Sequence, residues 1–189
     1  MFYELVKKNR SYRRFIEDKR ITMDELKALI DLARLAPSAA NLQKLRFYLV
    51  CDKEDCAALF PHLKWAGYLR YWDGPVEGER PIAYIIILAP QATNTYHSVD
   101  VGIAAQTIML GACEKGLGGC MFASMDKVAL HECFELAEDM EVALVLALGY
   151  PAETVVLEEM DDPDDVEYWR DDDGCHHVPK RKLEDLIIN

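Results

Sequence analysis

The order of apolar and polar residues along the chain predicts several strands and helices. Continuous apolar runs at 82–89 (IAYIIILA) and 141–151 (EVALVLALGYP) are typical of strands that are buried on both faces. A shorter run at 45–51 (LRFYLVC) predicts a third strand. Upstream of it, Thr22 and Glu25 have the spacing of a capping box, which begins a helix that Pro37 ends.

Further elements follow from helical spacing and from turn residues. A long apolar helix is expected from a cap at Ser98 to Lys115, with Gly116 as the residue that ends it. Shorter helices are expected at 2–9, 53–60 and 125–136. Stretches without a regular period are expected to be a loop at 38–43, an aromatic connector at 61–81, a glycine turn at 116–119 and an exposed acidic stretch at 153–173. Order is expected to return at 176–187.

The mixture of helices and strands favours an α+β or α/β layer fold, with a helix buried beside the sheet. No internal repeat or low-complexity linker divides the sequence. A length of 189 residues is typical of one compact domain. We therefore expect a single domain over 1–189, in which 153–189 forms an acidic segment and a C-terminal arm.

The composition narrows the class of partner. Asp and Glu outnumber Lys and Arg by 33 to 21, which gives a formal net charge of −12. Because such a field repels phosphate backbones, we expect no nucleic-acid partner. No apolar run approaches the ~20 residues of a membrane helix, so we expect no membrane association. The apolar fraction of 51% excludes wholesale disorder.

Two observations bear on the compartment. The first ten residues lack the apolar stretch of a secretion signal. The six cysteines have no CxxC spacing and read as reduced thiols in a chain of this size. A cytoplasmic protein is therefore expected.

Positive charge is concentrated in two places in spite of the acidic total. Residues 1–20 carry seven basic side chains against three acidic ones, and the segment 178–182 (VPKRK) is basic again. A small anionic ligand would account for such local positive charge.

Common catalytic and metal-binding motifs are missing from the sequence. No GxGxxG follows a strand, and there is no Walker A, GxSxG or HExxH motif. His176 and His177 could bind a metal only with partners from elsewhere, because neighbours in an extended segment point to opposite faces. We expect no metal site, and the sequence identifies no catalytic residue.

Two segments nevertheless contain residues that are suited to binding a ligand. In NRSYRRF, the guanidinium groups of Arg10 and Arg13 and the hydroxyl of Ser11 can surround one phosphate. In the segment 36–43 (APSAANLQ), small side chains and paired amides suit the edge of a flat heteroaromatic ring. The alternatives are a solvated basic face for the first segment and an ordinary helix-to-strand turn for the second.

In their order along the chain, these motifs resemble the FMN-dependent nitroreductase family. NRSYRRF is followed by APSAANLQ, a Gly-Leu-Gly turn after a long helix, LALGYP and a basic PKRK, so the resemblance spans nearly the whole chain. It implies a nitroreductase-like α+β fold with a mostly antiparallel central sheet flanked by helices. It also implies a homodimer that exchanges its C-terminal arms and binds two FMN molecules at the subunit interface.

The resemblance implies FMN contacts residue by residue. The contacts to the phosphate and ring would come from Arg10, Ser11, Arg13, Lys180 and Lys182. The flavin of the other subunit would be reached by Pro37, Ser38, Ala39 and Asn41. The backbone that passes over the isoalloxazine would be that of Met121, Phe122, Ala123 and Ser124. Further candidates are Asp100, Lys64 and the aromatic residues Trp65, Tyr68, Tyr71 and Trp72, although these aromatics also suit a core or dimer-interface cluster.

Three positions depart from the family pattern. Asn9 stands where an arginine is usual, Ala39 where a hydroxyl is common, and Lys44 where a proline usually follows the glutamine. The four basic residues expected at the phosphate, Arg10, Arg13, Lys180 and Lys182, are all present in spite of these differences, so FMN remains the expected cofactor.

The activity that the resemblance implies is an NAD(P)H-dependent FMN oxidoreductase. NADH or NADPH would reduce the flavin, and a small aromatic acceptor of the nitroaromatic, quinone or flavin type would reoxidise it by a ping-pong mechanism. The alternatives are a non-catalytic FMN-binding carrier or sensor, a flavin-dependent dehalogenase-type enzyme on the same fold, and a protein that binds another anion. The sequence specifies neither the physiological acceptor nor the preferred nicotinamide.

Overall fold

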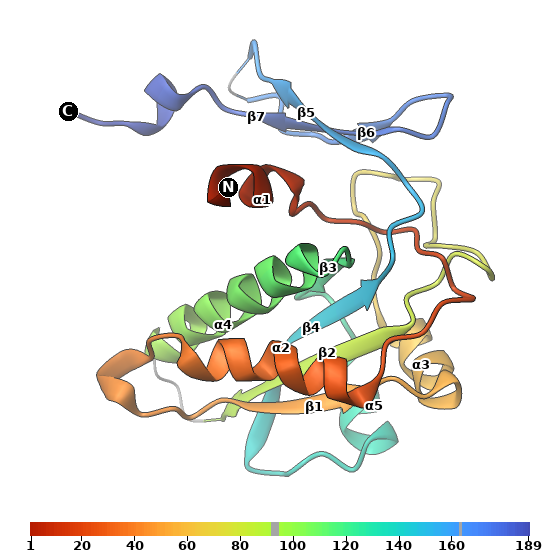
Figure 1. Ribbon diagram of the computed structural model, residues 1–189, viewed down its shortest axis with the longest axis vertical. Helices are drawn as coiled ribbons and strands as arrows, with labels where there is room; N and C mark the ends of the chain where they lie inside the picture. Colours follow the sequence, from red (N-terminus) through yellow and green to blue (C-terminus); the bar gives the residue numbers. More distant parts are fainter. Residues whose placement is uncertain (92–94, 163) are drawn as a thin grey trace.

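The central element of the fold is a four-stranded sheet with the strand order β1-β2-β4-β3 (Figure 1). The computed structural model describes residues 1–91, 95–162 and 164–189. The strands are β1 (Arg46–Val50), β2 (Ala83–Pro90), β3 (Gly118–Phe122) and β4 (Met140–Gly149), and every neighbouring pair is antiparallel. The mostly antiparallel α+β architecture expected from the family resemblance is confirmed.

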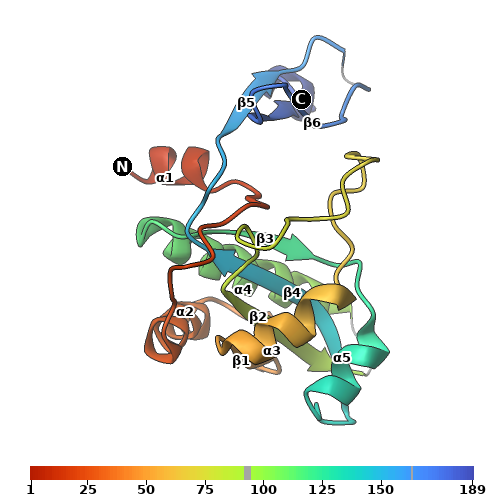
Figure 2. The same ribbon diagram turned by 90° about the vertical axis from the view of Figure 1, so that its right-hand side faces the viewer.

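The two central strands explain the long apolar runs in the sequence. Because successive residues of a strand face opposite sides, the run in β2 divides between two cores. Ile85 and Ile87 pack on one face, whereas Tyr84 and Ile86 pack on the other, and all four are fully buried. Four helices cover the faces of the sheet. The helices α2 (Met23–Leu35) and α4 (Thr95–Glu114) cover the first face, and α3 (Lys53–Leu59) and α5 (Lys127–Cys133) cover the second (Figure 2).

The ends of the helices follow local chemistry in most cases. The predicted capping box of α2 is present: Glu25 N–H donates to Thr22 Oγ1 at 3.2 Å, and Thr22 N–H donates to Glu25 Oε2 at 2.8 Å. At the C-terminal end of α4, Gly116 has φ +78°, and Leu117 N–H donates to Ala112 O at 2.9 Å. This is the hydrogen bond of a Schellman motif.

The cap predicted at Ser98 is wrong. The described part of α4 already begins at Thr95, so Ser98 lies inside the helix. Serine is tolerated in a helix interior, and its preference for caps does not by itself fix where a helix starts.

The glycine turn expected at 116–119 is only partly correct, because Gly118 and Gly119 already belong to strand β3. Gly119 pairs with Leu148 of β4, and a Cβ at Gly119 would come within 2.3 Å of the carbonyl oxygen of Ala147. The segment 121–124, whose backbone is expected to pass over the isoalloxazine, likewise begins within β3. Strand β3 therefore forms through its pairing with β4, because its own sequence lacks the alternation of apolar and polar residues that is typical of a strand.

The acidic stretch 153–173 is more ordered than expected. It contains β5 (Val155–Glu159) and β6 (Trp169–Arg170), which both pair with β7 (His176–Lys180) to form a second sheet in the order β5-β7-β6. The pair β5–β7 is parallel, and β6–β7 is antiparallel. The expected exposure is confirmed for most of the described residues of this stretch. The expected lack of order is wrong, because backbone pairing with β7 orders two segments of it.

The second sheet lies beyond helix α1 (Phe2–Lys8), so α1 lies between this sheet and α4 (Figure 1). The chain after α1 runs along the first sheet, where Tyr12 N–H donates to Gly119 O at 2.9 Å. The short 3₁₀ turns are η1 (Ala39–Asn41), η2 (Phe60–His62) and η3 (Leu183–Leu186). All six cysteines are free thiols, as predicted. Within the described ranges, no helix combines the length and the apolar character needed to cross a membrane.

Candidate functional site

A cavity of about 360 Å³ lies where the N-terminal segment, α4, β3 and the second sheet meet. It is lined by Asn9, Arg10, Ser11, Arg13, Gln106, Met109, Met121, Tyr168, His176, Val178 and Lys180. Three of these described residues carry a permanent positive charge and none is acidic. In a chain with a net charge of −12, this local concentration of positive charge would favour an anion.

Arg13 is held firmly in this cavity and is 8% exposed. Its Nη1 donates to His176 Nε2 at 3.0 Å, and its guanidinium lies 4.7 Å from the centre of the Tyr168 ring. Its backbone N–H donates to the carboxylate of Glu153. These contacts fix a charged group at the cavity wall before any ligand arrives.

His176 is a fully buried neutral imidazole. A guanidinium can only donate, so Nε2 accepts from Arg13 and the ring proton is assigned to Nδ1. Burial, reinforced by the positive charges of Arg13 and Arg170, lowers the pKa of His176 to about 4. At neutral pH the cavity therefore contains an uncharged histidine whose remaining N–H can donate.

Two buried donors at this cavity have no hydrogen-bond partner among the described residues. They are Nδ1 of His176 and Nε of Arg10. An unpaired buried donor costs roughly 1–3 kcal/mol, which a ligand with several acceptor oxygens would recover. The donors and the three cations therefore fit a phosphate group better than a neutral ligand.

Glu153 joins the segments that form the cavity. Its carboxylate accepts the backbone N–H groups of Arg13 and Arg14, and Arg170 Nη2 donates to it at 2.7 Å. The side chain of Glu153 is 1% exposed. This one carboxylate connects the N-terminal segment, the β4–β5 connection and β6.

The structure brings together part of the predicted FMN site. Arg10, Ser11, Arg13, Met121 and Lys180 line the cavity. The other predicted residues near this region, Phe122, Ala123, Ser124 and Lys182, do not line this cavity. The ammonium of Lys182 lies 3.8 Å from Glu159, the ring of Phe122 packs against Trp65, and Ala123 and Ser124 follow β3 on the way to α5.

The predicted loop 36–43 lies at a second cavity of about 270 Å³, which Pro37 and Ser38 line. There the buried carboxylate of Asp100 accepts the backbone N–H of Ala39 at 2.9 Å. Asn41 Oδ1 accepts from Gln43 Nε2 at 3.1 Å. Both cavities border α4, which gives Gln106 and Met109 to the first and Asp100 and Ala104 to the second.

Six lining residues of the first cavity were not predicted as site residues from the sequence: Asn9, Gln106, Met109, Tyr168, His176 and Val178. Gln106 is a polar residue in a mainly apolar helix, which was a usable signal. Tyr168 lies in the acidic stretch, where no feature of the sequence marked it as a site residue. For His176, the alternation of side chains along an extended segment indicates that one histidine of the pair faces inward, but not which one.

The two tryptophans of the aromatic connector are partly buried in an aromatic cluster, and Trp65 packs against the core. Trp65 packs against Phe122, Phe60 and Trp72, with ring centroids 4.7–6.0 Å apart. Tyr68 packs edge-on against Tyr168 at 5.0 Å and is thus one contact away from the cavity. Tyr71 is fully exposed. Of the two alternatives for these aromatics, the core reading fits Trp65 and Trp72.

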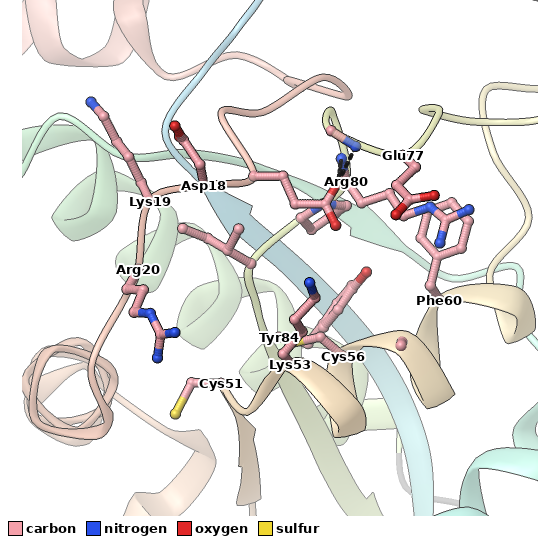
Figure 3. Close-up of a pocket in the computed structure, with 15 residues that line it drawn as sticks. Asp18, Lys19, Arg20, Cys51, Lys53, Cys56, Phe60, Glu77, Arg80 and Tyr84 are labelled. Carbon is pink, nitrogen blue, oxygen red and sulfur yellow. Dashed lines mark hydrogen bonds between the residues drawn. The ribbon is translucent and has the colours of Figure 1, made fainter.

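A larger cavity of about 540 Å³ lies elsewhere, between the segment 17–20, the start of α3 and the segment 77–84 (Figure 3). None of the residues expected to bind FMN lines it. Acidic residues such as Glu17 and Glu77 and basic residues such as Lys53 and Arg80 both occur in its wall. This mixture of charges makes it a poorer site for a phosphate than the cavity of about 360 Å³ that Arg10, Arg13 and Lys180 line.

The hydroxyl of Tyr84 in this larger cavity is buried and has no partner among the described residues. Its removal should therefore cost little. We expect Tyr84→Phe to leave the free energy of unfolding unchanged or to raise it by up to about 1 kcal/mol, because an unpaired buried hydroxyl is unfavourable. Urea unfolding measures the change, with Tyr48→Phe on the edge strand as a control. A loss above about 1 kcal/mol would show that the hydroxyl is paired in solution.

The structure combines an α+β fold with a positively charged cavity beside a long central helix. The family model of the nitroreductase family matches residues 6–68 and 74–150, so the chain belongs to this family.

Individual relatives agree with this assignment. The chain is 24% identical over 169 residues to an iodotyrosine deiodinase of Thermotoga neapolitana, covering 80% of this chain and 89% of the relative. It is 25% identical over 177 residues to a candidate NADH dehydrogenase/NAD(P)H nitroreductase of Methanothermobacter thermautotrophicus, covering 88% and 86%. Among solved structures, an FMN-dependent nitroreductase from Clostridium difficile R20291 superposes with a TM-score of 0.65 at 26% identity, covering 85% of this chain and 91% of that one.

Proposed function

We propose that the protein is an FMN-dependent oxidoreductase that uses NAD(P)H to reduce small aromatic acceptors such as nitroaromatics, quinones or flavins. The observation that carries the proposal is the cavity with three cations, two unpartnered donors and no described acidic residue in its wall. The relatives support it, since one is an FMN-dependent nitroreductase and another bears an NAD(P)H nitroreductase name.

The residues of the cavity have distinct tasks in this proposal. Arg10 and Arg13 would hold the phosphate through charge-assisted hydrogen bonds, Lys180 would add a third charge, and Ser11 a hydroxyl. Because Arg13 is fixed by His176 and Tyr168, the phosphate would anchor the ligand in one orientation. FMN, when bound, supplies the redox chemistry, since it can accept a hydride from NAD(P)H and reduce the acceptor afterwards in a ping-pong sequence.

We further propose a homodimer, in which Pro37, Ser38, Ala39 and Asn41 reach the flavin of the partner subunit. Large exposed apolar side chains support an interface: Phe2 and Tyr3 on α1, Val99 on α4, and Ile187 and Ile188 at the C-terminus. The arm at 153–189 would exchange between subunits of a single-domain, cytoplasmic protein. Analytical ultracentrifugation checks this, because a stable monomer that holds FMN tightly would contradict a shared site.

Two measurements test the proposed activity. Titration of flavin-free protein with FMN, followed by flavin fluorescence, measures binding. Stopped-flow mixing of the complex with NADH or NADPH then measures bleaching of the flavin absorbance. Rapid bleaching followed by reoxidation with a quinone supports the enzyme. Tight binding without bleaching would instead support an FMN carrier or sensor.

A second candidate function is reductive dehalogenation, which the similarity to an iodotyrosine deiodinase favours. Iodide release from iodotyrosine, measured with chemically reduced protein, tests this candidate independently of NAD(P)H. Release at a rate well above that of free reduced FMN would favour dehalogenation, and its absence would leave the nitroreductase proposal in place.

The two lysines of the C-terminal arm provide a matched comparison. Lys180 lines the cavity, whereas Lys182 is paired with Glu159. We expect Lys180→Ala to weaken FMN binding about tenfold, which corresponds to about 1.4 kcal/mol, and Lys182→Ala to change it less than about twofold. The dissociation constants of the two variants measure the difference. A larger effect at Lys182 would show that the arm holds the phosphate differently.

A further inference from the structure

The hairpin that joins β6 to β7 brings together three side chains that bind metals. Asp171 follows β6 directly, Cys175 precedes β7, and His177 is the second residue of β7. A carboxylate oxygen, the thiol sulfur and an imidazole nitrogen of these residues all lie within 4.8 Å of one another. We propose that Asp171, Cys175 and His177 form a zinc site. This site is separate from the cavity of about 360 Å³ that is proposed to bind FMN, called the flavin cavity below.

The backbone of the hairpin fixes two of the three ligands. Asp171 N–H donates to Cys175 O at 3.1 Å, and Cys175 N–H donates to Asp171 Oδ1 at 2.8 Å. Gly174 has φ +81° and donates its N–H to Asp171 O at 3.0 Å, which closes the tight turn. The side chains of Asp171 and Cys175 are therefore held next to each other without a metal.

The third ligand is oriented by contacts on two sides. His177 Nδ1 lies 2.7 Å from Glu158 Oε1, and its Nε2 lies 3.1 Å from Asp171 Oδ2. The Trp169 ring stacks on the imidazole with a centroid distance of 5.0 Å and an interplanar angle of 3°. A carboxylate on one nitrogen of a histidine that presents its other nitrogen to a metal is a common arrangement around zinc.

The chemistry of the ligands selects the metal. A thiolate, an imidazole and a carboxylate are the three ligand types that Zn²⁺ takes in proteins, and three protein ligands leave one tetrahedral position for water. A sulfur ligand disfavours Ca²⁺ and Mg²⁺, which bind oxygen. The sequence-based expectation of no metal site rested on the lack of partners for the His176–His177 pair. The structure supplies those partners for His177 alone, because His176 faces Arg13 in the flavin cavity.

The site also has a structural consequence. His177 lies on β7 between His176 and Lys180, which both line the flavin cavity. Bound zinc would tie β6 to β7 and raise the thermal midpoint, because a ligand that binds the folded state stabilises it. This effect does not depend on the proposed function, since no residue of the metal cluster lines the flavin cavity.

The experiment uses the full-length protein with its thiols kept reduced. Competition with a chromophoric chelator measures the affinity for Zn²⁺ and the number of ions per chain. Co²⁺ substitution tests the ligand set, because a tetrahedral thiolate site gives intense d–d bands and a sulfur-to-cobalt charge-transfer band. We expect one Zn²⁺ per chain, a rise in the thermal midpoint on adding Zn²⁺, and both cobalt signatures.

Variants make the assignment specific. Cys175→Ser and His177→Gln should abolish the charge-transfer band and the zinc-induced rise in the midpoint, while Cys133→Ser, which removes an exposed thiol on α5, should change neither. Glu158→Gln keeps all three ligands and should weaken Zn²⁺ binding about 10- to 100-fold. No zinc uptake by the unmodified protein would overturn the proposal. Zinc binding that survives Cys175→Ser unchanged would also overturn it, and would leave only an ion-pair cluster of His177 with two carboxylates.

Discussion

Replacing Glu153 with alanine is expected to lower the free energy of unfolding by about 3–5 kcal/mol, which is the usual cost of removing one partner of a buried ion pair. The substitution leaves Arg170, whose side chain is 12% exposed, without its carboxylate. It also leaves the backbone N–H groups of Arg13 and Arg14 without their acceptor. Urea unfolding followed by tryptophan fluorescence measures the loss.

A second glutamate of the arm provides the control for this prediction. Glu159 is 73% exposed and lies 3.8 Å from Lys182, so Glu159→Ala should cost no more than about 1 kcal/mol. If Glu153→Ala loses no more stability than Glu159→Ala, then Glu153 does not join the N-terminal segment to the second sheet.

Arg13→Ala is expected to raise the dissociation constant for FMN by about 30- to 150-fold, or about 2–3 kcal/mol. The variant removes a buried charge-assisted donor from the proposed phosphate site, and it deprives His176 Nε2 of its hydrogen bond. Titration of flavin-free protein measures the effect, and the thermal midpoint without flavin separates it from a loss of stability.

The adjacent arginine gives a matched control. Arg14 pairs with Glu79 at 3.2 Å and does not line the cavity, so Arg14→Ala should change the flavin affinity less than about twofold. Equal effects of the two substitutions would indicate that flavin responds to total charge and not to Arg13. An unchanged affinity of Arg13→Ala would remove this residue from the site.

The elements predicted from the sequence are those that local chemistry specifies. The capping box of α2, the glycine that ends α4 and the apolar runs of β2 and β4 each contain their own signal. Strand β5 does begin with a short β-branched run at Val155 and Val156, but acidic residues follow it directly. Strand β3 contains no such signal, because its glycine-rich segment becomes a strand only through hydrogen bonds to β4. Such pairing lies outside any local window of residues.

The same distinction applies to the candidate site. Arg10, Ser11 and Arg13 share one short motif, and their residue types suit either an anion site or a solvated basic face. The partners that fix Arg13 are Tyr168 and His176, which come from the far end of the chain. A buried histidine that accepts from an arginine, with its pKa lowered to about 4, is a property of the assembled site. No single segment could have predicted it.

The contact between Arg13 and His176 joins residues 163 positions apart. A ribosome adds about 5–20 residues per second, so Arg13 is made on the order of ten seconds or more before its histidine partner. For most of that interval the N-terminal basic cluster has neither β7 nor the carboxylate of Glu153 beside it. The complete set of residues that line the cavity is present only once β7 has been made, because His176, Val178 and Lys180 belong to it.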